Sequence, residues 1–64
     1  SQMKVYVICC NDSAEYAVIG DHDKEIAKKQ ELREAYYEKN KGCFRDKADY
    51  AARCAWYINL VSGE

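Results

Sequence analysis

The hydrophobic and polar positions along the chain first indicate a β-hairpin. Residues 4–10 are almost all β-branched, aromatic or cysteine residues, a composition that favours a pleated strand. Residues 11–13 (Asn-Asp-Ser) are types that form turns through hydrogen bonds from side chain to backbone. Residues 14–19 are typical of a second strand, which ends at Gly20. We therefore predict two antiparallel strands joined by a short turn.

The next segment has the composition of a long helix. Nearly every residue from 24 to 39 is a good helix former. Asp21 is suited to cap its start, and Asp23 and Glu25 place negative charge in the first turn, where the helix dipole favours it. Gly42 suits the left-handed residue that often ends a helix.

This helix is expected to be longer than the sheet. A helix of about 20 residues spans roughly 30 Å, whereas a strand of about seven residues spans only about 23 Å. The end that carries Tyr36 and Tyr37 therefore needs cover. Asp46 can cap a short second helix that runs to about Cys54, and this helix is the expected cover. Residues 56–61 then alternate as a third strand.

The predicted fold is α+β, with the element order β-β-α-α-β. The simplest arrangement is a three-stranded antiparallel sheet in the order 2-1-3, with the long and the short helix on one face. A chain of 64 residues forms a single domain, to which we assign residues 3–64. Residues 1–2 are interpreted as an expression remnant before a native start at Met3.

The first strand is apolar on both faces, because residues 5, 7 and 9 point to one side and residues 6, 8 and 10 to the other. Such a strand should be buried on both sides, but one helical layer covers only one. An exposed apolar face usually marks an interface. We predict an uncovered interaction face formed by Tyr6, Ile8, Cys10, Tyr16, Val18 and Tyr57. The alternative is that tyrosines shield this face of a monomer. Cores this small seldom stabilise a fold alone, so we favour a partner protein or a second copy of the chain, which would form a homodimer.

Charge narrows the classes of partner. Ten Lys and Arg against 11 Asp and Glu give a net charge of −1, which argues against a nucleic-acid binder and against a polybasic membrane anchor. The longest apolar run, residues 5–10, is far shorter than the roughly 20 residues of a membrane helix. No signal-peptide pattern is present, so we expect a cytoplasmic protein with reduced thiols.

The four cysteines show no C-x-x-C spacing. Cys9 and Cys10 are adjacent in a strand and must point to opposite faces. Cys43 lies among basic residues, a setting typical of reactive thiols. The favoured interpretation is that these cysteines, Cys54 included, are free thiols that pack as small apolar groups. A redox- or zinc-responsive module built from them remains an alternative.

The single histidine lies at the predicted helix start. Asp21, His22, Asp23 and Glu25 superficially suggest a metal site, but zinc prefers nitrogen and sulfur ligands. Capping and the helix dipole explain the acidic residues. The chain contains no phosphate-binding glycine loop and no nucleophile-elbow motif. We therefore expect no catalytic residue, no metal and no cofactor, and a protein that is not an enzyme.

A second set of interaction residues is predicted on the long helix. Tyrosine is an efficient interface residue, and lysines on one sector favour an acidic or phosphate-bearing partner. The simpler interpretation is a solvated flank with aliphatic stems over the sheet. The set is Lys28, Lys29, Tyr36, Tyr37 and Lys39.

The chain opens with residues 3–8 (Met-Lys-Val-Tyr-Val-Ile) and continues with a hairpin, one charged helix and a terminal strand around residues 56–58 (Trp-Tyr-Ile). In this outline it resembles small uncharacterised proteins encoded by bacteriophages and prophages. The resemblance implies a bacterial host cytosol and interference with a host defence system by binding, as anti-CRISPR proteins do. No functional residue is carried over, because no motif is shared.

The leading hypothesis is a small non-enzymatic binding protein, a phage-type inhibitor that occludes a host protein through its sheet face or an open sheet edge. One alternative is a homo-oligomer that sequesters a small anionic ligand, such as a nucleotide, at the subunit boundaries. The other is the cysteine-based redox or zinc module.

Overall fold

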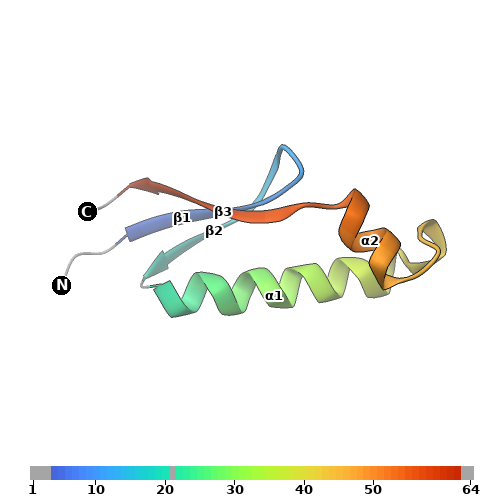
Figure 1. The fold of residues 1–64 in the computed structure, drawn as a ribbon. Coiled ribbons are helices and arrows are strands. Elements are labelled where there is room, and N and C mark those ends of the chain that lie inside the picture. Colours follow the sequence, from blue (N-terminus) through green and yellow to red (C-terminus); the bar gives the residue numbers. More distant parts are fainter. Residues whose placement is uncertain (1–3, 21, 63–64) are drawn as a thin grey trace.

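The computed structural model describes residues 4–20 and 22–62, and it confirms the predicted α+β fold and element order (Figure 1). The predicted cap Asp21 lies outside the described residues. The elements are β1 (Lys4–Cys10), β2 (Ser13–Gly20), α1 (His22–Lys39), a short 3-10 turn η1 (Lys41–Cys43), α2 (Lys47–Arg53) and β3 (Trp56–Ser62).

The sheet is antiparallel in the order β2-β1-β3, as predicted. Ile8 in the central strand lies opposite Tyr16 in β2 and Ile58 in β3. The hairpin turn is tight, because Cys10 already pairs with Ser13. Asn11 adopts a left-handed φ of 54° there, a conformation that asparagine tolerates better than most residues.

The turn also holds the start of β3. Asn11 N–H donates to the carbonyl of Ala55 over 2.7 Å, and Ala55 N–H donates to Asn11 Oδ1 over 2.9 Å. This reciprocal pair joins two positions far apart in the sequence. It fixes where the third strand begins relative to the hairpin.

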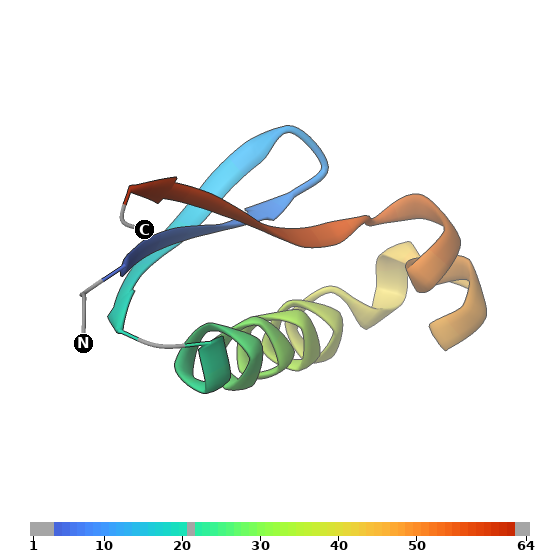
Figure 2. The same cartoon turned by 60° about the vertical axis from the view of Figure 1, so that its left-hand side comes forward.

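The molecule is elongated because α1 runs on past the sheet (Figure 1). Its extents are 43 × 18 × 15 Å and its radius of gyration is 13.0 Å, against about 11 Å for an average domain of this length. Figure 2 shows that α1 lies on one side of the sheet. The predicted overhang is therefore confirmed.

Aromatic side chains cover the overhanging end of α1, and we call them the aromatic cluster. Tyr50 of α2 is its centre, with only 3% of its surface exposed. Ring centroids within the cluster lie 5.0 to 6.3 Å apart, in the range where offset and edge-on contacts are favourable. The cluster consists of Tyr36, Tyr37, Phe44, Tyr50 and Trp56. It confirms that the second helix covers Tyr36 and Tyr37.

Hydrogen bonds lock this cluster to both neighbouring elements. Trp56 Nε1–H donates to the Tyr50 hydroxyl over 2.7 Å, and that hydroxyl donates to the carbonyl oxygen of Arg33 over 2.8 Å. One buried hydroxyl thus ties α2 to β3 and to α1. Burial is the main cause that raises the pKa of Tyr50.

The start of α2 is built as predicted. The Asp46 carboxylate accepts the N–H of Asp49 over 2.8 Å, which is an N-cap. Asp49 in turn accepts the backbone N–H of Arg45 over 3.0 Å and a guanidinium N–H of Arg53 over 3.1 Å. These contacts, the Arg45 N–H first, lower the pKa of Asp49.

The end of α1 differs from the prediction. Gly42 lies inside the 3-10 turn Lys41–Cys43, and Gly20 is the glycine with positive φ among the described residues. The helix ends at Lys39, and the residue that caps this end is Asn40. The Asn40 side-chain amide donates to the carbonyl of Tyr36 over 2.9 Å and satisfies one group of the last turn.

Candidate functional site

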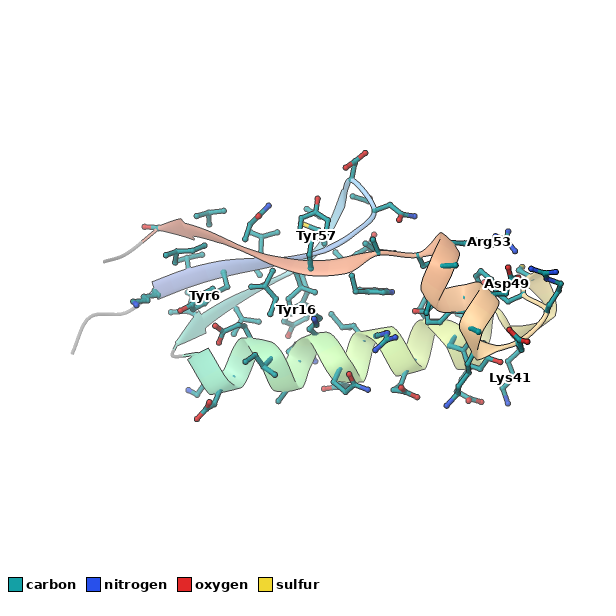
Figure 3. All side chains as sticks on the ribbon, viewed as in Figure 1. Tyr6, Tyr16, Lys41, Asp49, Arg53 and Tyr57 are labelled. Carbon is teal, nitrogen blue, oxygen red and sulfur yellow. The ribbon has the colours of Figure 1, made fainter. Side chains whose placement is uncertain are left out.

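The sheet face that packs on α1 is the one predicted to be uncovered. Tyr6, Ile8 and Cys10 are 8%, 0% and 9% exposed. Tyr16 also points toward α1, because Lys28 Nζ lies 4.5 Å from the centroid of its ring; Figure 3 shows Tyr6 and Tyr16 on this side. Val18 shares the face, since it pairs with Tyr6. The predicted outer face was therefore wrong.

Tyr57 belongs to the opposite face. It pairs with Cys9, so the two side chains lie on the same side of the sheet, and Figure 3 shows Tyr57 pointing away from α1. Its inclusion with Tyr6 and Ile8 was wrong as well. The physical reason is that both faces of the first strand are equally apolar, so a period of two separates the faces without saying which one the helix covers.

The uncovered face is the surface of the sheet away from α1 (Figure 2). Ile19 is 59% exposed there and Tyr57 is 37% exposed, while Val5 and Val7 are half-buried. Cys9 is buried within this face, with the Asn59 side-chain amide 4.0 Å from its sulfur. From the register, the face consists of Val5, Val7, Cys9, Ala17, Ile19, Tyr57 and Asn59.

The edge of the sheet formed by β3 is also open. Its sequence, residues 56–62 (WYINLVS), contains no charged residue and no proline, the two features that commonly prevent an edge strand from pairing. Leu60 is 52% exposed and Val61 is 57% exposed. The edge strand β2 differs, since it carries Glu15.

The predicted helix residues do not form one surface. Lys28 lies over the Tyr16 ring and pairs with Glu31 over 3.3 Å. Tyr36 and Tyr37 belong to the aromatic cluster, and Lys39 is an exposed residue of the last turn. Lys29 lies elsewhere again, in a groove between α1 and the start of β3.

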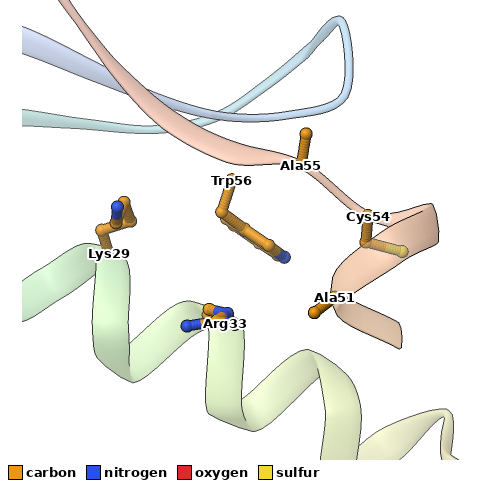
Figure 4. A pocket seen from close by; sticks show the side chains of 6 residues that line it. All are labelled: Lys29, Arg33, Ala51, Cys54, Ala55 and Trp56. Carbon is orange, nitrogen blue, oxygen red and sulfur yellow. The ribbon is translucent and has the colours of Figure 1, made fainter. Parts of the chain in front are cut away.

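This groove has a volume of about 300 Å³ (Figure 4). We call it the basic groove. Its lining residues are Lys29, Arg33, Ala51, Cys54, Ala55 and Trp56. Sequence reasoning missed Arg33 and Trp56. The spacing of Lys29 and Arg33, four residues apart on the helix, was the available signal.

The cysteines are free thiols in three different places. Cys10 and Cys54 lie close together, and burial followed by repulsion from Cys54 raises the pKa of Cys10. Cys9 lies within the uncovered face, and Cys43 is exposed in η1. Within residues 4–20 and 22–62, no three His, Cys, Asp or Glu side chains gather in a way that would hold a metal ion. The group around His22, which the sequence argues against as a metal site, includes Asp21 and the His22 side chain, and these lie outside the described residues.

No protein-family model, no curated protein and no solved structure matches this chain. Among the described residues, no helix is both long enough and apolar enough to span a membrane.

Proposed function

We propose that this chain is a non-enzymatic binding protein whose partner protein docks on the uncovered face of the sheet. The observation that carries the proposal is an apolar face with no element of the described chain over it. Exposed contiguous apolar surface of this kind usually marks an interaction site. Tyr57 suits the role, because tyrosine combines a large apolar ring with a polar tip.

The open edge of β3 extends this surface. A strand of the partner that pairs with β3 would satisfy the free backbone groups of the edge and bury Leu60 and Val61. The absence of charge in β3 removes any electrostatic penalty to such pairing. Face and edge therefore support the same mode of binding, in which the partner's own surface is occluded.

The resemblance to phage and prophage proteins supports a bacterial host protein as the partner. Inhibition by steric occlusion needs only a stable complex and no reaction. The charged residues of α1 and α2 then contribute to orientation and to the rate of encounter.

The experiment begins with the absolute mass in solution, by light scattering after size exclusion with reductant. The tagged wild type, Ala17→Lys and Ala52→Lys are then incubated with bacterial lysate. Ala17 lies opposite Val7 on the uncovered face, whereas Ala52 is an exposed residue of α2 and serves as the matched control.

A protein recovered by the wild type and by Ala52→Lys but lost with Ala17→Lys supports the proposal. The same recovered proteins with all three variants, or none with any, would contradict it. A stable dimer that Ala17→Lys converts to a monomer would also contradict it, because a second copy would then occupy the face.

A further inference from the structure

The basic groove lies away from the uncovered face and has a different chemistry. One wall is α1, which supplies Lys29 and Arg33, and the other is the junction between α2 and β3 (Figure 4). Ala51 leaves the space between the walls open on the α2 side because its side chain is small (Figure 4). The volume of about 300 Å³ is at the lower end of small-ligand sites.

The two cations of the groove have no counter-ion among the described residues. Lys29 and Arg33 are both half-buried, and among residues 4–20 and 22–62 no carboxylate lies within ion-pair distance of either. Like charges four residues apart destabilise a helix. An anion in the groove would relieve that repulsion.

Among the described residues, Lys4, Lys24 and Lys39 likewise have no ion pair, whereas the remaining cations do. Lys28 is next to Lys29 in the sequence and is equally a helix residue, yet it pairs with Glu31. Further pairs join α1, η1 and α2, and they are Lys41–Glu38, Arg45–Asp49, Lys47–Glu34 and Arg53–Asp49. What sets Lys29 and Arg33 apart is that both are half-buried and line the same hollow.

Trp56 gives the groove an apolar wall of fixed orientation. Its Nε1–H is already used in the 2.7 Å hydrogen bond to the Tyr50 hydroxyl, and its ring lies edge-on to Tyr36 at 6.0 Å. The indole therefore offers carbon surface to a ligand and no donor. Aromatic side chains of this kind stack on the flat rings of nucleobases, and they do so with little regard to which base it is.

We propose that the basic groove binds a small phosphate ester that carries a flat ring, the class to which nucleoside monophosphates belong. The Arg33 guanidinium matches two phosphate oxygens, and Lys29 adds a point charge one turn away. Trp56 contacts the ring. This site is independent of the docking proposed for the uncovered face.

The test uses Trp56 itself, because it is the only tryptophan in the chain. Adenosine monophosphate is titrated into the protein while tryptophan fluorescence and the indole N–H signal in a nitrogen-resolved NMR spectrum are recorded. We expect a saturable change in both signals. Lys29→Gln/Arg33→Gln should weaken binding about tenfold or more, since it removes the charge-assisted contacts.

Three controls make the result specific. Lys39→Gln changes an exposed cation of the same helix and should bind within about twofold of wild type. Ala17→Lys should also bind normally, which separates this site from the uncovered face. The double variant should keep its fold by circular dichroism, because the Arg33 carbonyl still accepts from Tyr50.

A comparison of three ligands tests recognition of the phosphate and recognition of the ring separately. Adenosine should bind much more weakly than the monophosphate, and inorganic phosphate should compete only at higher concentration. Equal binding of adenosine would overturn phosphate recognition, and equal binding of inorganic phosphate would overturn recognition of the ring. An unchanged affinity in the double variant, or no saturable signal, would overturn the site.

Discussion

At the end of the molecule where α2 packs, aromatic rings pack on one another and their polar groups are hydrogen-bonded, whereas no element of the described chain covers the apolar outer surface of the sheet. Tyr50 in the aromatic cluster is 3% exposed, and Ile19 on the uncovered face is 59% exposed. A chain of 64 residues has little core to distribute. Here that core lies along β1 and at Tyr50, and the outer sheet surface stays available for binding.

The largest effect should follow from removing the centre of the aromatic cluster. Tyr50→Ala deletes a buried ring and should lower the free energy of unfolding by about 3–5 kcal/mol, as for other buried aromatic residues. Tyr57→Ala on the uncovered face should cost about 1 kcal/mol or less. Urea unfolding followed by circular dichroism measures both, and equal losses would contradict the comparison.

Tyr50→Phe tests the hydrogen bonds separately from the ring. It keeps the packing but leaves Trp56 Nε1–H and the Arg33 carbonyl without their partner. We expect a loss of about 1–3 kcal/mol in the same measurement. A loss as large as that of Tyr50→Ala would mean that the ring contributes little.

A smaller effect is expected at Gly20, where β2 passes to α1. Gly20 has a φ of 153°, and a Cβ there would lie 2.8 Å from Cδ of Lys24. The Lys24 side chain can move, so the backbone conformation dominates. Gly20→Ala should cost about 1 kcal/mol, whereas Gly42→Ala, which meets open space, should be close to neutral and serves as its control.

The dependence of stability on pH should expose the contacts of Asp49. Because the pKa of Asp49 is lowered in the folded chain, its carboxylate stabilises the fold above its ordinary pKa of 3.8. That stabilisation is lost as the pH falls through the folded value. The difference between wild type and Asp49→Asn should therefore be full at neutral pH and shrink below about pH 4. A difference that is constant with pH would contradict this.

The smallest expected effect is a difference in reactivity between two thiols of the wild-type protein. Burial and the nearby Cys54 raise the pKa of Cys10, and the thiolate is the reactive form. Cys43 is exposed, so alkylation at slightly alkaline pH should modify Cys43 before Cys10. Mass spectrometry of partially modified protein gives the order, and the reverse order would contradict the assigned environments.

The sequence was sufficient for the elements and their order. Asp46 as a cap and the overhang at Tyr36 follow from local patterns, and the central position of the first strand follows from the simplest way to connect the elements; the structure confirms all three. The first two depend on composition or on length, which are properties of a segment taken alone.

The candidate sites were less accessible, because they depend on how segments meet. Ile8 and Val7 are both apolar, and only the packing of α1 makes one buried and the other part of the uncovered face. The basic groove needs α1 and the start of β3 side by side. Glu25, expected simply as first-turn charge, is fully buried, which no capping pattern indicates.

The bond pair between Asn11 and Ala55 has a consequence for folding kinetics. The hairpin and α1 form from neighbours in the sequence, whereas β3 must close a loop of more than 40 residues before it gains any contact with β1. During synthesis β3 leaves the ribosome after all the other described elements. Until it does, the central strand of the sheet has a free edge, and this nascent species is the one most exposed to misassembly.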